Sequence, residues 1–186
     1  MVLLVAGMPG SGKSVVCSVA KSMGLPVYVL GDIVREEVAK RGLEPTLENL
    51  LRVAEELRIQ RGKGAVAELL VEKMLHQCIE SCVVVVDGVR SLEEVKVFRE
   101  KLGVEVLIVA VHASPRTRFE RLKQRARPGD PRSWEEFVER DLKELRWGLG
   151  DVIALADYMI VNERSLDELI GNVRDLLSKV ISEWCT

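Results

Sequence analysis

The sequence predicts a three-layer α/β fold with a five-stranded parallel sheet. Short apolar runs alternate along the chain with longer segments of helical periodicity, which is typical of parallel β-α units joined by right-handed crossovers. A glycine-rich segment, residues 7–14, separates the first apolar run from the first helical segment. With 186 residues, 47% of them hydrophobic, the chain is expected to form a single domain, residues 1–186, around one buried core.

The predicted strands are short and rich in Val, Ile and Leu, and the predicted helices fill the intervals between them. The third apolar run does not alternate with polar residues, which indicates a strand buried on both faces. The predicted strands are Val2–Ala6, Val27–Leu30, Val83–Asp87, Val104–Val111 and Tyr158–Val161. The predicted helices are Lys13–Met23, Ile33–Arg41, Leu47–Gln60, Ala65–Glu80, Leu92–Lys101, Pro115–Arg125, Trp134–Trp147, Asp151–Ala156 and Leu166–Trp184.

Residues 7–14 form a complete G-x-x-x-x-G-K-[ST] phosphate-binding loop, the P-loop, between the strand and the helix that this motif requires. Its glycines let backbone N–H groups face phosphate oxygens, and the helix N-terminus adds partial positive charge. Lys13 is expected to reach the β- and γ-phosphates, and Ser14 to bind Mg²⁺. The motif predicts a P-loop NTPase fold that binds ATP through Gly7, Met8, Pro9, Gly10, Ser11, Gly12, Lys13, Ser14 and Val15.

Two arginines follow the second and third predicted strands. Arg35 stands in a Gly-Asp-x-x-Arg segment, and Arg90 stands three residues after the third strand. Because parallel strands end at one edge of the sheet, both are expected near the P-loop, where they would hold the phosphate of an acceptor. Asp32 is either the N-cap of the next helix or, for a hydroxyl acceptor, the general base.

About fifty residues of nearly continuous helical pattern separate the second and third strands. A single crossover needs only about 12 residues. Residues 32–81 are therefore predicted to be a helical, acceptor-binding insertion over the carboxyl edge of the sheet. The Pro- and Gly-rich segment 127–132 is predicted to be the tip of a short lid, residues 116–140, with an ordinary helix–helix turn as the alternative.

The third strand ends in Asp87, and Gly88 follows it. A carboxylate at the end of a buried strand beside a P-loop is expected to hold Mg²⁺ or its water shell. A capping role suits Asp87 poorly, because Ser91, with Glu94 at the capping-box position, fits that role better. ATPases that split water commonly carry a glutamate at the position of Gly88. The absence of a glutamate at this position favours transfer of a phosphoryl group to an acceptor over hydrolysis.

Arg118, Arg121 and Arg125 are spaced i, i+3 and i+7, so they share one face of a predicted helix. Stacked like charges repel unless an anion binds to them. Beside a P-loop, these arginines and Arg127 are expected to clamp phosphates. A solvated basic helix is the alternative, and a surface ion pair explains Arg140 almost as well as a phosphate contact does.

The bulk properties point to a cytoplasmic protein. The net charge of −2 gives no general attraction to nucleic acid or membranes. No apolar run approaches the ~18 residues of a membrane span, and the first strand leaves no room for a signal peptide. The four cysteines are expected to be idle or buried thiols, although in a hyperthermophile a disulfide from Cys17 or Cys78 is the alternative.

Taken together, these segments resemble the nucleoside-monophosphate kinases. Adenylate kinases pair a P-loop with a Gly-Asp-x-x-Arg segment, matched by residues 31–35, and an Asp-Gly-x-x-Arg segment, matched one residue short by residues 87–90. Arg121 and Arg125 match that family's lid-entry arginines, one of which stacks on the donor adenine. Residues 156–162 and 165–169 look like the last strand and adenine-side loop of dephospho-coenzyme A kinases. The whole chain is similar to an archaeal family related to both kinases.

The resemblance implies an ATP-binding phosphotransferase that moves the γ-phosphoryl group of MgATP to a small nucleotide-like acceptor. It does not cover the acceptor region, residues 43–81. The alternatives are a nucleotide-dependent ATPase of RNA or ribosome assembly and a non-catalytic ATP-binding protein, although nucleic acid is not an expected partner. The implied roles are catalysis for Lys13, Arg121, Arg125, Arg127 and Asp32, donor binding for Arg121 and Asn162, and acceptor binding for Asp32, Arg35 and Arg90.

Overall fold

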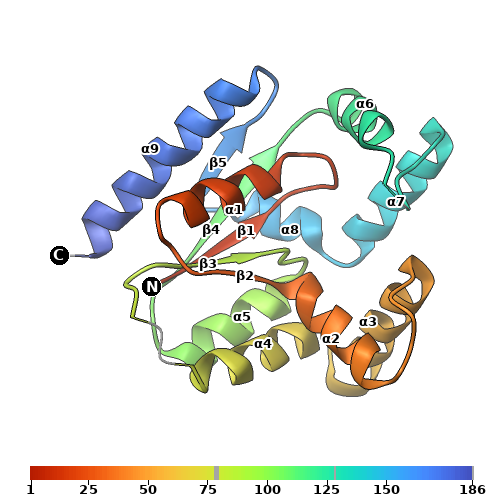
Figure 1. Ribbon diagram of the computed structural model, residues 1–186, viewed down its shortest axis with the longest axis horizontal. Coiled ribbons are helices and arrows are strands. Elements are labelled where there is room, and N and C mark those ends of the chain that lie inside the picture. The colour runs from red at the N-terminus through yellow and green to blue at the C-terminus, as the bar shows by residue number, and fades with distance from the viewer. Residues whose placement is uncertain (78–79, 128, 186) are drawn as a thin grey trace.

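The computed structural model describes residues 1–77, 80–127 and 129–185. In these ranges five parallel strands form one sheet in the order β2-β3-β1-β4-β5, which confirms the predicted fold class (Figure 1). The strands are β1 (Val2–Ala6), β2 (Val27–Val29), β3 (Val84–Asp87), β4 (Val106–His112) and β5 (Tyr158–Val161). The helices are α1 (Lys13–Ser22), α2 (Leu30–Lys40), α3 (Leu47–Arg61), α4 (Ala65–Leu75), α5 (Leu92–Leu102), α6 (Pro115–Arg125), α7 (Trp134–Arg146), α8 (Leu149–Ala154) and α9 (Leu166–Trp184).

Helices cover both faces of the sheet, and each face has its own apolar core. One core joins the sheet to α1 and α9, and the other joins it to α2, α3, α4, α5 and α8. The central strand β1 is buried along its whole length, as its unbroken apolar sequence predicts. Within the described residues, no helix is both long enough and apolar enough to span a bilayer.

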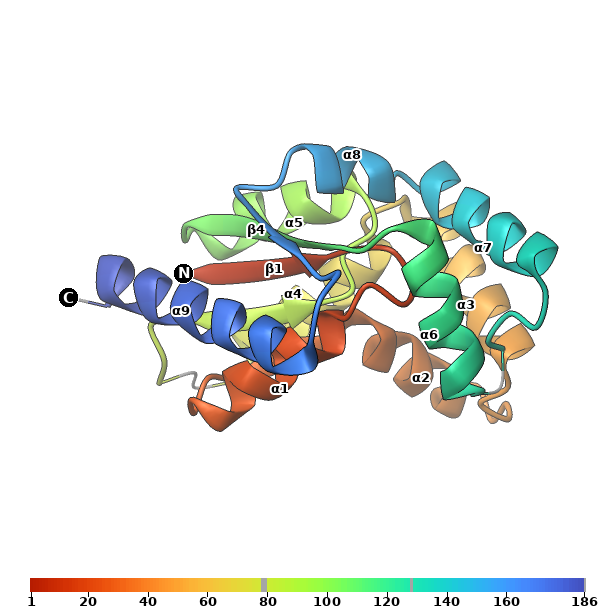
Figure 2. The same ribbon diagram turned by 90° about the horizontal axis from the view of Figure 1, so that it is seen from above.

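The strand register places the predicted metal-binding carboxylate beside the P-loop. Val5 of β1 is paired with Asp87 at the end of β3, and the P-loop begins two residues after Val5. Because the strands are parallel, the loops after β1, β2 and β3 all emerge at the same edge of the sheet. This edge also carries α2, α3, α6 and α7 (Figure 2).

The edge strand β2 is shorter than predicted. It has three residues, and α2 begins directly at Leu30, so Gly31 and Asp32 lie in the first helical turn. Val29 is the N-cap of α2, and its backbone is extended. The interpretation of Asp32 as the N-cap was therefore wrong.

The segment from residue 32 to residue 81 has two structural parts. α2 and α3 extend beyond the carboxyl edge of the sheet, whereas α4 covers the sheet beside α5 (Figures 1 and 2). Six residues of α4 are buried in the core, which makes it the crossover helix into β3. The predicted helix 65–80 ends at Leu75 in the structure, and its residues 78–79 lie outside the described ranges.

A disulfide joins Cys82, just before β3, to Cys185 at the end of α9. The expectation of idle thiols was wrong for this pair, because folding brings their Cα atoms to within 5.6 Å of each other. Cys17 is a buried free thiol, so it does not form the alternative disulfide, and Cys78 lies outside the described residues. Burial and the nearby charge of Asp87 raise the pKa of Cys17 to about 12 and keep the thiol protonated.

Candidate active site

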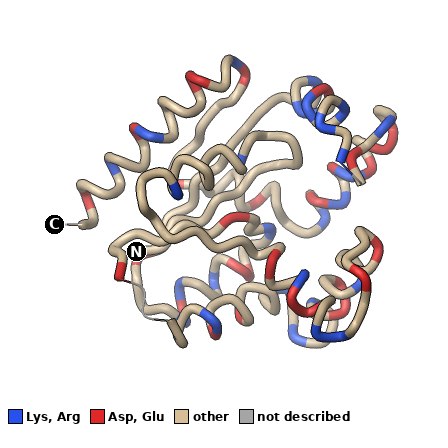
Figure 3. The backbone as a smooth tube through the Cα atoms, viewed as in Figure 1, with Lys and Arg blue, Asp and Glu red and all other residues tan. Residues whose placement is uncertain are grey.

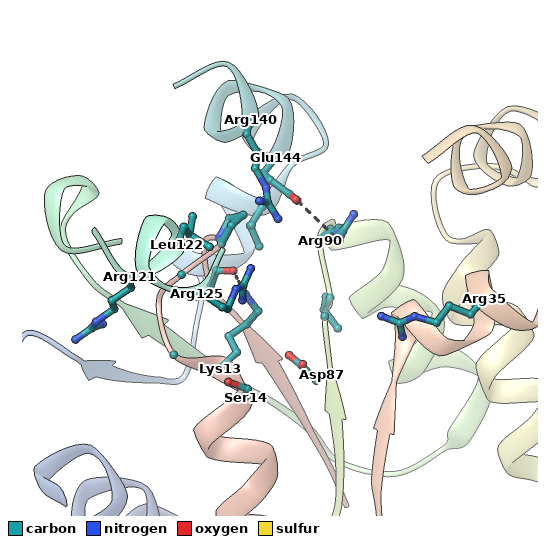
Figure 4. A pocket seen from close by; sticks show the side chains of 17 residues that line it. Lys13, Ser14, Arg35, Asp87, Arg90, Arg121, Leu122, Arg125, Arg140 and Glu144 are labelled. Atoms are coloured by element: carbon teal, nitrogen blue, oxygen red, sulfur yellow. Dashed lines mark hydrogen bonds and ion pairs between the residues drawn. The ribbon is translucent and has the colours of Figure 1, made fainter. Parts of the chain in front are cut away.

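A pocket of about 450 Å³, here called the donor pocket, lies at the carboxyl ends of β1 and β3. Its walls come from the P-loop, α2, the segment after β3, α6 and α7 (Figure 4). The predicted site residues on its lining are Gly7, Pro9, Gly10, Gly12, Lys13, Ser14, Arg35, Asp87, Arg90, Arg121 and Arg125. Predicted residues that do not line it are Met8, Ser11, Val15, Asp32, Arg127 and Asn162.

Two glycines of the P-loop occupy positions that no other residue would tolerate. Gly10 and Gly12 have φ angles of 82° and 105°, in the left-handed region. A Cβ atom on Gly12 would lie 2.3 Å from Nδ2 of Asn162, and one on Gly10 would lie 2.9 Å from the carbonyl oxygen of Arg118. The glycines therefore serve both the loop conformation and the close approach of neighbouring segments.

Asn162 supports the P-loop from behind. Its side chain is buried, with 6% exposed, and its Nδ2 donates a hydrogen bond of 2.8 Å to the carbonyl oxygen of Ser11. Its Oδ1 accepts a hydrogen bond of 3.2 Å from Nη2 of Arg121, and its backbone N–H donates to the carbonyl oxygen of His112. In this structure Asn162 fixes the P-loop and Arg121, and it does not open onto the donor pocket.

Arg118 differs from the prediction that three arginines of α6 face one anion. Its side chain is 4% exposed and makes a two-bond ion pair with Asp141 of α7, with Nη1 2.8 Å from Oδ1. It also donates hydrogen bonds to the carbonyl oxygens of Ala113 and Pro9 and lies over the ring of Phe137. The prediction was wrong for Arg118 because α7 packs against that face of α6 and supplies the counter-charge.

Lys13 and Asp87 face each other's charge inside the donor pocket. Lys13 Nζ donates hydrogen bonds to the carbonyl oxygens of Gly7 and Met8. Burial lowers the pKa of Lys13, and the nearby charges of Asp87 and Glu144 oppose this lowering. Burial likewise raises the pKa of Asp87, and the charge of Lys13 opposes that rise.

The donor set fits a hydrated magnesium ion. Oδ1 of Asp87 is buried and has no hydrogen-bond partner among the described residues, and the side chain of Ser14 is exposed at the first turn of α1. Mg²⁺ keeps several waters and takes only one or two protein oxygens beside substrate phosphates. In the described part of the chain, no group of three His, Cys, Asp or Glu residues forms another candidate metal site.

The two predicted acceptor arginines both line the donor pocket, and each already has a carboxylate partner. Arg35 pairs with Asp32 on the exposed side of α2. Nε of Arg90 lies 3.5 Å from Oε2 of Glu144, and its guanidinium group lies 5.0 Å from the centre of the Trp147 ring. The Arg90 side chain is therefore held between Glu144 and Trp147, whereas the pair of Arg35 with Asp32 is more than half exposed.

Glu94 has a different role from the one the capping box predicts. Its backbone N–H donates to the side chain of Ser91, which confirms Ser91 as the cap of α5. Its buried carboxylate, however, accepts a hydrogen bond of 2.7 Å from the backbone N–H of Arg90 and faces Arg58 at 3.6 Å. Glu94 therefore fixes the backbone that carries Arg90.

The loop between α6 and α7, residues 126–133, is here called the lid loop, and its centre is Asp130. The carboxylate of Asp130 accepts hydrogen bonds from Arg125 (2.8 Å from Nε), Arg140 (3.3 Å) and the backbone N–H of Arg127. The hydrogen bonds from Arg125 lower the pKa of Asp130 to about 2. The Arg127 side chain lines a separate hollow on the lid loop, so the structure does not bring it to the donor pocket.

Two acidic residues at and beside the site, Glu144 and Asp141, were given no role from the sequence. Both lie on the inner face of α7, where Phe137, Asp141 and Glu144 are spaced i, i+4 and i+7. A helical wheel that starts from Phe137 would have placed these two carboxylates toward the interior. Acidic side chains on a buried face need a cationic partner, and that signal was available in the sequence.

The comparisons with known proteins agree with this architecture. A family model described as an AAA domain matches residues 6–138, so the chain carries a domain of that family. The UPF0200 protein of Hyperthermus butylicus (strain DSM 5456 / JCM 9403 / PLM1-5) is 60% identical over 183 residues, which cover 98% of this chain and 96% of that protein. The UPF0200 protein of Thermococcus onnurineus (strain NA1) is 52% identical, and the match covers 98% and 100% of the two chains.

The chain belongs to the UPF0200 family. Its fold is similar to that of TT1252 from Thermus thermophilus, with a TM-score of 0.66 and 22% identity over 96% of this chain and 97% of the other. It is also similar to a shikimate kinase from Acinetobacter baumannii in complex with shikimate (TM-score 0.59, 16% identity, 98% and 93% covered). At these identities the likeness shows the fold alone, so this UPF0200 family member has a P-loop kinase-like fold, as predicted.

Proposed function

We propose that this UPF0200 family member is a phosphotransferase that moves the γ-phosphoryl group of MgATP to a small acceptor. The observation that carries the proposal is the donor pocket itself, where Lys13, Asp87 and arginines from α2, α6 and the segment after β3 line one space. Gly88, which also lines it, stands where a water-splitting ATPase has its glutamate. Arginine-rich pockets beside a P-loop suit phosphoryl transfer, because charge spreads over the moving group.

The donor side binds the triphosphate through groups that are already in place. The P-loop amides and the N-terminus of α1 face the phosphates, and Lys13 exchanges its bonds to the carbonyl oxygens of Gly7 and Met8 for phosphate oxygens. Because Lys13 is partly buried, its charge is less screened by solvent than that of a surface lysine and acts more strongly on the phosphates. Arg121, with a buried Nη1 that has no hydrogen-bond partner among the described residues, contacts the donor nucleotide from α6.

Ser14 and Asp87 would hold the magnesium ion, the latter through water. When bound, the metal neutralises the charge that develops on the β- and γ-phosphate oxygens. The orphaned Oδ1 of Asp87 supports this assignment, because a buried carboxylate oxygen without a donor is costly unless a ligand satisfies it.

Closure of the lid loop would complete the site. Arg125 lines the donor pocket, and its partner Asp130 belongs to the lid loop. When a triphosphate binds, Arg125 exchanges Asp130 for the transferring phosphoryl group, and the pocket excludes water. Arg127 is not needed for this mechanism.

The acceptor is expected at the side of the pocket formed by Arg35 and Arg90. Structural neighbours of the same fold include a gluconokinase from Sinorhizobium meliloti 1021 and the shikimate kinase noted above, both named for small-molecule substrates. This favours a small acceptor over a macromolecule. A nucleotide-like acceptor, as the resemblance to adenylate kinase implies, is one member of that class.

An acceptor screen tests the proposal. The purified protein is incubated with γ-labelled ATP and candidate acceptors, and labelled products are separated from inorganic phosphate. We expect label on an acceptor, and we expect Lys13→Met to abolish it while retaining the fold. Label that reaches only water, at a rate that no acceptor changes, would contradict the proposal.

One observation favours the second candidate function, a nucleotide-dependent ATPase. Glu144 lines the donor pocket, and a carboxylate there is able to orient a water molecule. On this alternative, RNA or a ribosomal particle would stimulate ATP hydrolysis in the absence of any small acceptor. The same labelled assay separates the two functions, because it distinguishes labelled acceptor from free phosphate.

A further inference from the structure

A second cavity of about 450 Å³ adjoins the donor pocket, between α3 and α7. The two spaces share Arg90, Arg140 and Glu144 on their linings. Leu47 and Leu51 of α3 and the ring of Trp147 give the second cavity an apolar part. A volume of this size falls within the range of about 300–1,000 Å³ that is usual for small-molecule sites.

The lid loop and α3 meet at the rim of the second cavity. A Cβ atom on Gly129 would lie 2.4 Å from Cδ2 of Leu47, so the lid loop touches the start of α3. Gly129, Asp130 and Pro131 of the lid loop all line the cavity. The space therefore lies between α3 and the lid loop and adjoins the donor pocket at Arg90, where the proposed function expects the acceptor.

Carboxylates balance the cations on this side of the molecule. On the lining of the second cavity, Arg90 pairs with Glu144 and Arg140 pairs with Asp130, and Lys143, Glu136 and Glu139 lie there as well. Figure 3 shows both signs of charge interleaved along α2, α3 and α7. On the donor side, by contrast, Lys13 and Arg121 make their hydrogen bonds to neutral carbonyl and amide groups. The excess positive charge thus lies where ATP binds, and the second cavity suits an acceptor with little charge of its own.

Glu144 lies at the junction of the two spaces. Its side chain is 9% exposed, and its Oε2 has no hydrogen-bond partner among the described residues, although it lies 3.5 Å from Nε of Arg90 (Figure 4). A buried carboxylate oxygen without a donor costs free energy unless a ligand supplies one. Because Glu144 lines both spaces, an acceptor hydroxyl in the second cavity would meet this carboxylate.

Asp32, the carboxylate that the sequence suggested as general base, is placed differently. Its side chain is 56% exposed and pairs with Arg35. It lines neither the donor pocket nor the second cavity as the structure describes them. A general base must reach the proton that it removes, and Glu144 meets this requirement better.

We propose that Glu144 is the catalytic proton acceptor and that the acceptor is an uncharged or singly charged alcohol that occupies the second cavity. This inference rests on the proposed phosphoryl transfer. As the acceptor oxygen bonds to the γ-phosphorus, its O–H bond breaks and the proton passes to Glu144. The bond from the γ-phosphorus to the bridging oxygen breaks, and its electron pair stays on the nucleoside diphosphate. An acceptor that presents an ionised phosphate would need no such base and would meet the negative charge of Glu144.

The test compares Glu144→Gln with a matched control on the same helix, Glu135→Gln, an exposed residue that lines neither cavity. Transfer from γ-labelled ATP is measured to four alcohols (shikimate, gluconate, glycerol and adenosine) and to two phosphates (AMP and CMP). We expect wild type and Glu135→Gln to label an alcohol. Glu144→Gln should lose about 10²–10⁴-fold in kcat, which is the usual contribution of a general base. Its KM for ATP and its melting temperature should stay close to wild type.

Glu144→Asp guards against a purely structural loss, because it keeps a negative charge on the same side of α7 as Arg90 but withdraws the carboxylate from the junction. We expect wild-type stability and a kcat between those of wild type and Glu144→Gln. Transfer to AMP or CMP but to no alcohol, or full alcohol transfer by Glu144→Gln, would overturn this inference and leave the proposed function standing. ATP turnover that labels none of the six probes would overturn the proposed function as well.

Discussion

The P-loop lines the donor pocket, the lid loop lines the second cavity beside it, and the molecule holds the two loops by contacts of different kinds. Buried side chains hold the P-loop: Arg118 bonds to the carbonyl oxygen of Pro9, and Asn162 bonds to that of Ser11. The lid loop is held by ion pairs that converge on the carboxylate of Asp130, which is 4% exposed, from Arg125 and Arg140, whose side chains remain 39% and 33% exposed.

This difference indicates which of the two loops already has its final conformation before ATP binds. A buried hydrogen bond is costly to break, because its partner is then left without one, at about 1–3 kcal/mol. Asp130 has two arginine partners and a backbone N–H, so Arg125, which is partly exposed, can leave for another anion while Asp130 stays paired. The P-loop is therefore fixed before ATP binds, whereas Arg125 can exchange the carboxylate of the lid loop for a phosphate.

The largest expected effect comes from removal of the buried arginine under the P-loop. Arg118→Ala leaves the half-buried Asp141 without its counter-charge, and breaking a buried pair in this way costs about 3–5 kcal/mol. Urea unfolding measures the change. Arg121→Ala, one turn further along α6, is the control, and we expect it to weaken ATP binding with little change in stability. Equal destabilisation by the two variants would contradict the assignment of a structural role to Arg118 and an ATP-binding role to Arg121.

The second-largest effect concerns Arg125, which lines the donor pocket and pairs with Asp130 of the lid loop. Arg125→Ala should lower kcat for the proposed transfer by about 100-fold or more, because it removes a cation from the transferring group. The free energy of unfolding should change by less than about 1 kcal/mol, because Arg125 is partly exposed and Asp130 keeps Arg140 and the backbone N–H of Arg127 as partners. Steady-state kinetics and urea unfolding on the same samples give both values. A stability loss as large as that of Arg118→Ala would show that the lid loop is fixed as firmly as the P-loop.

Asn162→Ala should have an intermediate effect on the P-loop. The carbonyl oxygen of Ser11 and the guanidinium group of Arg121 each lose a hydrogen bond. We expect KM for ATP to rise about tenfold, which corresponds to about 1.4 kcal/mol. Asn162→Asp tests the hydrogen bond to Ser11 alone, because a carboxylate has the shape of the amide but cannot donate to the carbonyl oxygen of Ser11. If both variants bind ATP as tightly as wild type does, the P-loop does not depend on this contact.

The smallest effect is a pH dependence at Asp130. The pKa of Asp130 in the folded protein is about 2, below the ordinary 3.8, so its ion pairs stabilise the fold fully above pH 3.8. This stabilisation is lost as the pH falls through about 2, where the carboxylate is protonated. Asp130→Asn should lower the urea midpoint slightly near neutral pH, and the difference from wild type should shrink toward pH 2. A difference that grows in acid would contradict this assignment.

The local features of the fold were predictable from sequence. β1, β5, α6 and α9 begin and end at the predicted residues, because strong local signals such as the apolar run of β1 and the serine cap of α6 fix them. The P-loop and Asp87 were predictable for the same reason, since both follow directly from a strand end. The start of α2 was not predictable, because nothing local distinguishes a three-residue edge strand from a four-residue one.

The partners of the charged residues were not predictable. Arg118 and Asp141 are 23 residues apart, and Cys82 and Cys185 are 103 residues apart, so tertiary packing alone brings each pair together. The sequence showed three arginines on one face of α6 but not the three different surroundings that α7, Asn162 and the lid loop give them. The roles of Arg118 and Glu144 therefore required the structure.

The bond between Cys82 and Cys185 makes a covalent ring of the segment that it encloses. The lid loop, α7 and the last two strands all belong to that ring. A protease that cuts once within it opens the ring but releases no fragment. The nicked protein should migrate as one chain in a denaturing gel without a reducing agent and as two once a thiol is added. A protein cut once in the lid loop would therefore test whether the site needs an intact lid loop, because its two fragments stay joined by the disulfide.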